Sequence, residues 1–197
     1  MRSRPSRRAI LVALGAIAVP IGGFYLLRTP FPADTTPEGA YMRIARSVAD
    51  DDPRSFFAYL EQEAQWACYT IRDKRREASK RVLASYPEPL RAEMSTRYRA
   101  IGDLADGADV FAALYRDRGW ARRLRKDTSG VASVDREGDR ASVVTVRGTR
   151  WPFRRRDNGI WGITIFTAEL LADAEKATRD LALVEAAAND YDRAKGK

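Results

Sequence analysis

The amino-acid sequence predicts an α+β fold, in which N-terminal helices pack on a four-stranded, mostly antiparallel sheet and a long helix follows the sheet. Apolar residues recur at helical spacing before Gly130 and again after Thr167. Between these positions the period falls to two, as it does in strands. A single N-terminal transmembrane helix is predicted in addition, because residues 9–27 contain no charged side chain.

The uncharged stretch 9–27 is the membrane signal. As a helix it would span roughly 28 Å, close to the hydrocarbon thickness of a bilayer. Residues 1–8 form a basic tail before it, so the positive-inside rule predicts a cytoplasmic N-terminus, a periplasmic body and a single pass through the inner membrane. Two alternatives are a cleaved signal peptide, since Ala16–Ile17–Ala18 is an Ala-x-Ala site, and twin-arginine export, since Arg7 and Arg8 are paired.

Helix-start signals mark the beginning of the body. Residues 28–36 are proline-containing and are predicted to be a linker, followed by one extracytoplasmic domain over residues 37–194. An N-cap, a proline and an acid at Thr36-Pro37-Glu38 predict a helix over 37–50. Asp52-Pro53 repeats the signal and predicts a second helix.

A longer helical region follows, with a break predicted near residues 61–63 and an end before Pro87. Further helices are predicted over 88–101 and 107–118. The apolar positions assigned to the long helix are Trp66, Tyr69, Ile71, Ala78, Val82 and Leu83. Cys68 lies among them and is expected to be a buried small hydrophobe.

Four strands are predicted over 131–136, 140–147, 149–155 and 160–166. The last two are joined at Asp157-Asn158-Gly159, and Asn-Gly favours a type I′ hairpin turn. Pro152 cannot donate to a ladder, so we expect a bulge or an outward-facing nitrogen there.

The predicted C-terminal helix carries a heptad-like apolar stripe. We interpret it as the face that docks on the chain's own sheet. A homodimer through this helix is the alternative. The stripe consists of Leu170, Ala174, Ala177, Leu181, Val184, Ala188 and Tyr191.

Composition limits the chemistry that the chain can perform. It contains no His and one Cys, which excludes Ser-His-Asp triads and Cys-rich zinc sites, and we expect no metal and no cofactor. The net charge of +8 is concentrated in the leader, since residues 29–197 hold 30 basic and 27 acidic side chains. The near-neutral body makes nucleic acid an unlikely partner.

One hairpin concentrates arginine beside Trp151 and Phe153. Basic residues interleaved with aromatics can bind phosphates or anionic lipid headgroups. The alternative is a solvated sheet face whose arginines pair with nearby acids. The candidate polyanion-binding residues are Arg147, Arg150, Arg154, Arg155 and Arg156.

Two stretches resemble the nuclear-transport-factor-2-like, or cystatin-like, superfamily. One is the opening pair of helices, with Pro37, Ala40, Ala49, Asp52, Phe56, Leu60 and Glu63-Ala64. The other is the closing hairpin from Phe153 to Ile163, with its Gly159-Ile160-Trp161. The resemblance implies a curved sheet wrapped on a long helix, often with a pocket, in a binding or accessory role. The whole chain is also similar to uncharacterised envelope proteins of myxobacteria-like bacteria.

Together these features favour a membrane-anchored, non-enzymatic binding or scaffold module of the bacterial cell envelope, with an envelope protein or an anionic ligand as its partner. The first alternative is a small enzyme with a carboxylate or Tyr buried in the cone, which a deep pocket around such a group would favour. The second is a polyanion or anionic-lipid binder that uses the arginine hairpin.

Overall fold

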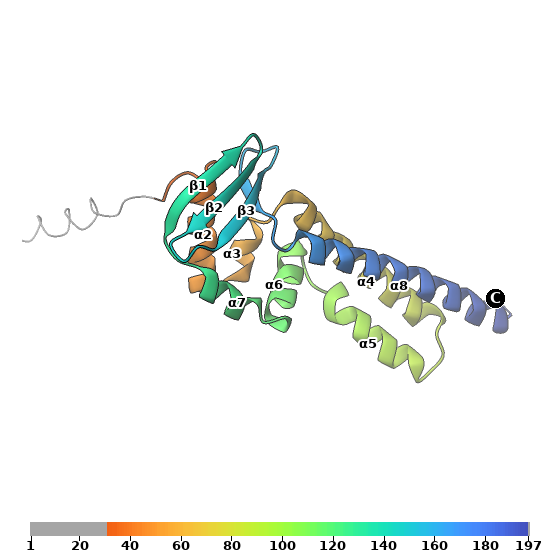
Figure 1. Cartoon of the computed structure of the whole chain (residues 1–197). Coiled ribbons are helices and arrows are strands. Elements are labelled where there is room, and N and C mark those ends of the chain that lie inside the picture. Colours follow the sequence, from red (N-terminus) through yellow and green to blue (C-terminus); the bar gives the residue numbers. More distant parts are fainter. Residues whose placement is uncertain (1–30, 197) are drawn as a thin grey trace, which may run out of the picture. The chain divides into compact units, whose positions relative to one another are not determined.

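The computed structural model describes residues 31–196, which Figure 1 draws in colour. The chain divides into two compact units, residues 1–32 and residues 33–197, and every described helix and strand belongs to the second unit. The predicted basic tail 1–8 and the predicted anchor 9–27 lie outside the described residues, as does the start of the linker. Within residues 31–196 no helix is both long and apolar enough to cross a bilayer.

The predicted α+β class is confirmed. Four strands form one sheet in the order β1-β2-β3-β4, and every neighbouring pair is antiparallel. The strands are β1 (Val131–Glu137), β2 (Arg140–Thr145), β3 (Arg150–Arg155) and β4 (Trp161–Ile163). In β2 and β3, residues that face the core alternate with more exposed ones, as the sequence period predicts.

The last strand is shorter than predicted, and Pro152 explains part of the difference. Of the two alternatives predicted at Pro152, a bulge or an outward-facing nitrogen, the bulge is absent, because the β2–β3 register stays regular there. A separate register shift lies between Val131 and Ser133 of β1. The Thr164 N–H donates to the Pro152 carbonyl (3.1 Å), but Pro152 has no N–H to return. The ladder therefore stops at Ile163.

The β3–β4 turn also differs from the prediction. A type I′ turn needs positive φ at both central residues. Here Gly159 has φ +82° while Asn158 does not, and the Gly159 N–H bonds to the Arg156 carbonyl (2.9 Å). Asn158 instead uses its side-chain oxygen to accept from the Ile160 N–H (3.1 Å), which makes a longer loop with glycine in the left-handed position.

Four helices complete the half of the unit that contains the sheet: α2 (Pro37–Ala49), α3 (Pro53–Phe57), α6 (Gly107–Asp117) and α7 (Trp120–Asp127). We call the sheet with these helices the sheet half (Figure 1). Thr36 and Asp52 cap α2 and α3 through their side-chain oxygens, as predicted. The sequence analysis missed α7, which starts after Gly119 in a left-handed conformation (φ +62°).

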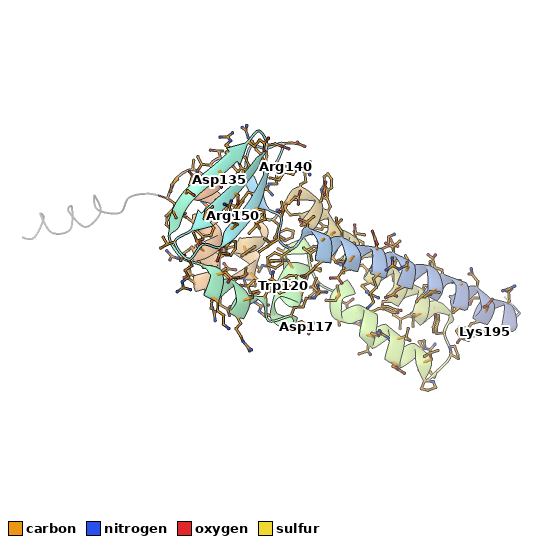
Figure 2. All side chains as sticks on the ribbon, viewed as in Figure 1. Asp117, Trp120, Asp135, Arg140, Arg150 and Lys195 are labelled. Carbon is orange, nitrogen blue, oxygen red and sulfur yellow. The ribbon has the colours of Figure 1, made fainter. Side chains whose placement is uncertain are left out.

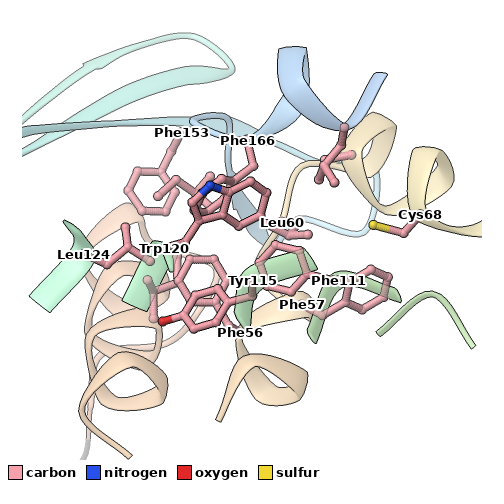
Figure 3. Close-up of a cluster of buried hydrophobic side chains, with 14 of the residues drawn as sticks. Phe56, Phe57, Leu60, Cys68, Phe111, Tyr115, Trp120, Leu124, Phe153 and Phe166 are labelled. Carbon is pink, nitrogen blue, oxygen red and sulfur yellow. The ribbon is translucent and has the colours of Figure 1, made fainter. Parts of the chain in front are cut away.

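The core of the sheet half is packed with aromatic rings (Figure 3). Trp120 stacks on Phe166 with ring centroids 4.2 Å apart, and Phe111 lies 5.7 Å from the same ring. Phe56 joins them from α3 at 5.9 Å. The interior is thus filled by side chains, not hollowed into a deep pocket.

Three helices extend from the sheet half: α4 (Gln62–Ser85), α5 (Leu90–Gly102) and α8 (Thr167–Ala194). The break predicted before α4 is confirmed. We call residues 75–102 and 177–194 the helical arm, in which α4 and α8 run side by side and α5 packs on α4 (Figure 1). A second, smaller core holds the arm together, formed by Ala78, Val82, Tyr86, Tyr98, Leu181, Val184 and Ala188.

The apolar stripe of the C-terminal helix docks on α4 and not on the sheet, so our interpretation of its partner was wrong. Leu170, Ala177 and Val184 are each no more than 2% exposed. Because the stripe is covered within the chain, a homodimer through α8 would have to use another face of this helix. The homodimer stays a prediction.

Candidate functional site

The five arginines of the predicted hairpin lie in different environments in the structure. Arg150 lies on the outer face of the sheet and pairs with Asp135 of β1 (2.9 Å; Figure 2). Arg154 faces three carboxylates, those of Glu61 (3.4 Å), Asp139 (3.6 Å) and Glu63 (3.7 Å). The hydrogen bond to Glu61 and the nearby negative charge raise the pKa of Arg154 above its ordinary value.

Arg147 and Arg156 are bound to backbone carbonyls. Arg147 donates to the Lys126 carbonyl (2.5 Å). Arg156 donates to the carbonyls of Ala58 (2.9 Å) and Leu60 (3.4 Å), where α3 has ended. Burial lowers the pKa of the Arg156 guanidinium. Both side chains therefore tie a loop to a neighbouring helix end.

Arg155 differs from the other four arginines. It is exposed, and no carboxylate within residues 31–196 lies within ion-pair distance of it. The structure does not gather the five predicted residues into one cationic surface. Polyanion binding by the hairpin stays a prediction, with Arg155 as the guanidinium that is free to bind.

A cleft lies where this hairpin meets the corner between α3 and α4, and we call it the Trp66 cleft. Its volume is about 260 Å³. Carboxylates and guanidiniums both line it, and its one aromatic side chain is an indole. The lining residues are Glu61, Gln62, Glu63, Trp66, Asp139, Arg154, Arg155, Arg156 and Asp157.

Backbone pairing at the corner positions the floor of the cleft. The Ile163 N–H donates to the Tyr59 carbonyl (2.8 Å), and the Glu61 N–H donates to the Ile163 carbonyl (3.0 Å). Gly162 allows this approach, because a Cβ at that position would lie 2.7 Å from the backbone nitrogen and Cα of Glu61. The corner thus covers the outer edge of β4 and holds Glu61 beside the sheet.

Glu61 is the buried carboxylate of the cleft, with 6% of its surface exposed. One carboxylate oxygen accepts from the Thr167 hydroxyl at the start of α8 (2.6 Å), and the other accepts from Arg154 (3.4 Å). A buried charge is costly unless it is paired and hydrogen-bonded, and here it is both. Glu61 therefore joins α4, α8 and β3.

Trp66 supplies the exposed apolar surface of the cleft. Trp66, Tyr69 and Leu83 lie in the long helix, as the sequence predicts, but they are 60%, 38% and 48% exposed. The buried residues of α4 stand at other positions, because this helix packs against α8, α5 and α6 and buries only some of its faces.

The sequence analysis also missed Glu61 as a site residue. The only signal was an acid directly after Leu60, at the predicted break. A charge at a corner between apolar residues is typical of a solvated turn as well, so the pattern alone does not distinguish a buried carboxylate from an exposed one. Its burial depends on Gly162 and Thr167, which are distant in the sequence.

The remaining reactive groups are buried in the core. Cys68 is buried as predicted, and burial, with a contribution from the charge of Asp173, raises the pKa of its thiol to about 12. Burial also raises the pKa of Tyr41, whose hydroxyl donates to the Ser129 carbonyl (2.6 Å). Within residues 31–196 no three His, Cys, Asp or Glu side chains are placed to hold a metal ion.

Comparisons of the chain with protein-family models, with curated proteins and with solved structures gave no match.

Proposed function

We propose that this protein is a non-enzymatic binding module of the bacterial cell envelope, tethered to the inner membrane by residues 9–27, with its body in the periplasm. We further propose that it contacts a partner protein through the Trp66 cleft. The observation that carries the proposal is an indole that is 60% exposed beside the unpaired Arg155. Trp and Arg are the residue types most enriched at the energetic centres of protein interfaces.

The size of the cleft favours a protein partner. Pockets for small molecules and cofactors usually enclose about 300–1,000 Å³. A volume of about 260 Å³ suits one or two side chains of a docked segment better. An apolar group of such a segment would cover the indole, and a carboxylate or carbonyl would bind Arg155.

Photo-crosslinking in the native host tests the site. The full chain carries a photoreactive phenylalanine derivative in place of Trp66, and a matched control carries it in place of Leu183, which is 70% exposed on α8. We expect one defined adduct from position 66, none from position 183, and a weaker adduct when Arg155→Ala is added. Equal adducts from both positions would refute the proposal.

The tether is tested separately. Reporter enzymes fused after Asp34 and after Lys197 should both be active as periplasmic reporters and inactive as cytoplasmic ones. Activity of the cytoplasmic reporter at both sites would refute the predicted topology without affecting the cleft.

Catalysis by Glu61 is the second candidate function, favoured by the burial of this carboxylate on the cleft floor. Against it, both carboxylate oxygens already accept hydrogen bonds from the chain itself. The crosslinked partner, once identified, allows catalysis to be distinguished from binding. A chemical change in the partner caused by the wild-type chain but not by Glu61→Gln supports catalysis, whereas binding without change supports the module.

A further inference from the structure

A group of neighbouring unpaired cations lies on α7, whereas the arginine hairpin contributes one unpaired guanidinium, that of Arg155. Residues 116–127 carry six basic and two acidic side chains. Their balance of +4 exceeds the +3 of residues 29–197 as a whole, so the rest of the body is slightly negative. Residues 147–156 carry a larger balance of +5, but four of their five arginines are bound to carboxylates or backbone carbonyls of the chain. Around α7 a larger part of the positive charge is unpaired.

Packing turns one face of α7 to the solvent. Trp120 and Leu124 are 5% and 1% exposed and fix the helix to the aromatic core. Figure 2 shows Trp120 and Asp117 at this end of the sheet half. We call Arg122, Arg123 and Lys126 the α7 basic face; all three are exposed.

The side chains of this face are unpaired. Arg118 and Arg125, their neighbours, are bound to Asp173 and Asp51. For the α7 basic face, by contrast, no carboxylate of residues 31–196 lies within ion-pair distance. An external anion can therefore bind there without breaking an internal ion pair.

The surroundings of the face are shallow and lack exposed aromatic rings. Its three residues line a depression of about 430 Å³ together with Arg118, and the carboxylates of Asp117 and Asp127 lie at the same depression, which leaves cations in excess there. Arg122 also lines a second depression of about 290 Å³ that includes Arg116. Single-stranded nucleic acid is usually bound by stacking on aromatic side chains, and the only indole of α7 is buried. A flat array of cations with no ring to stack on suits an extended anionic surface.

We propose that the α7 basic face docks the body on the anionic lipid headgroups of the membrane that anchors it. This inference rests on the tether in the proposed function and is independent of the Trp66 cleft. The linker 28–36 reaches at most about 30 Å, so a tethered body stays close to the bilayer. Each Lys or Arg near an anionic leaflet strengthens the contact roughly fivefold, and the tether makes such weak contacts sufficient.

Energy transfer to labelled lipids tests the inference on the full chain in nanodiscs. A donor dye is placed on Val146→Cys, which is 72% exposed beside Arg147, or on Leu183→Cys of the arm, which is 70% exposed. The native thiol of Cys68 needs no removal, since burial suppresses its reactivity. Discs contain either phosphatidylcholine alone or an equal mixture with phosphatidylglycerol.

We expect greater transfer from position 146 in anionic discs than in neutral ones, no such difference from position 183, and loss of the difference in 0.5 M NaCl. Replacing Arg122, Arg123 and Lys126 with Gln should remove the difference, because three cations together contribute roughly a hundredfold. The matched control replaces three exposed, unpaired cations of the helical part, Lys80, Arg97 and Lys176, and should keep it.

Three outcomes would overturn the inference. One is equal transfer in the two discs, and another is equal loss in the control variant, which would indicate bulk charge only. The third is that duplex DNA binds and that this binding depends on the α7 basic face, while energy transfer is no greater in anionic discs than in neutral ones.

A chain that separates from both kinds of disc during gel filtration indicates that the tether has failed, which is a different result. The same labelled chain is then mixed with anionic and neutral vesicles, and equal transfer to both overturns the inference.

Discussion

The sheet half and the helical arm are stabilised by different forces. In the sheet half, Trp120, Phe166 and Phe111 form part of one continuous aromatic core. The core of the arm is smaller, with two Tyr, two Val, two Ala and one Leu buried, and polar bonds surround it. Arg75 pairs with Asp180 (2.6 Å), and Ser85 donates to Asp192 (3.0 Å). The stability that comes from apolar burial does not depend on pH, whereas the stability that comes from paired charges does.

The contrast predicts that the two parts unfold differently. An aromatic core that spans the sheet half should open only in global unfolding, while the arm should open locally at lower cost. The Trp66 cleft lies between the sheet half and the first turns of α4, outside the helical arm, and would then stay formed while the arm fluctuates.

The largest expected effect is that of Gly162→Val. Its side chain would meet the backbone of Glu61 and Leu60 at 2.7 Å, and backbone there cannot move without separating β4 from the corner. We expect loss of the folded sheet half, seen as loss of near-ultraviolet circular dichroism. Gly130→Ala is the matched control, since its nearest neighbour is a Val146 methyl at 3.6 Å, and it should unfold like the wild type. A folded Gly162→Val chain would contradict the proposed corner.

Two core truncations compare the halves directly. Phe166→Ala removes a ring that contacts Trp120, Phe111 and Phe56, and should lower the free energy of unfolding by about 3–5 kcal/mol. Leu181→Ala in the arm should lower the free energy of unfolding by about 2–3 kcal/mol, at the low end for such changes, because Leu181 is buried in a small core with few neighbours. Urea unfolding measures both.

Hydrogen exchange distinguishes where each truncation acts. Leu181→Ala should speed exchange in residues 78–98 and 181–191 and leave β2 and β3 protected. Phe166→Ala should speed exchange in both halves. If both variants speed exchange equally in all residues, the unit unfolds as one, and the sheet half and the arm do not differ in local stability.

A smaller effect is expected from acid. The hydrogen bond from Ser85, with the charge of Arg81, lowers the pKa of Asp192 below its ordinary value of 3.8. A carboxyl whose pKa is lower in the folded state stabilises that state above its ordinary pKa and loses this contribution as the pH falls through the folded value. Protection factors in the arm, that is exchange rates corrected for the intrinsic rate at each pH, should therefore fall as the pH drops below the ordinary pKa of this carboxyl, 3.8.

Asp192→Asn should make arm exchange faster at neutral pH and weaken its dependence on acid. Asp190→Asn is the control, because Asp190 pairs only with Arg193 on the same helix. An arm whose exchange has the same pH dependence in the Asp192→Asn variant and in the wild type would show that this bond does not stabilise it.

Local signals predicted most of the fold. The caps at Thr36 and Asp52, the break before α4 and the change of period at Gly130 each depend on neighbouring residues, and the structure confirms them. The missed features depend on distant residues. The end of β4 at Ile163 is set by Pro152 and by the corner at Tyr59, and the docking of α8 on α4 is invisible in a stripe that would suit a sheet equally well.

The candidate site was harder to predict for the same reason. A run of arginines predicts positive charge, but four of the five guanidiniums are bound by groups from elsewhere in the chain. Arg154 meets Glu61, and Arg156 meets the carbonyl of Ala58. The free cations of the α7 basic face belong to a helix that the sequence analysis missed, because its first residue follows Gly119 and only Trp120 and Leu124 mark its apolar face.

The last prediction uses the labelling rate of Cys68 to report which half has opened in the two truncation variants. Cys68 lies at the edge of the aromatic core (Figure 3). With its pKa raised to about 12, only about one thiol in ten thousand is ionised at pH 8, so the native chain should resist thiol reagents. Opening the arm alone should not change this, because Ala67 and Ile71 beside Cys68 belong to the core of the sheet half. The Leu181→Ala variant should therefore label as slowly as the wild type, while Phe166→Ala labels faster. Rapid labelling of Leu181→Ala would mean that α4 moves as one rigid helix and carries the opening of the arm into the sheet half, and the two regions would then have to be treated as a single cooperative unit.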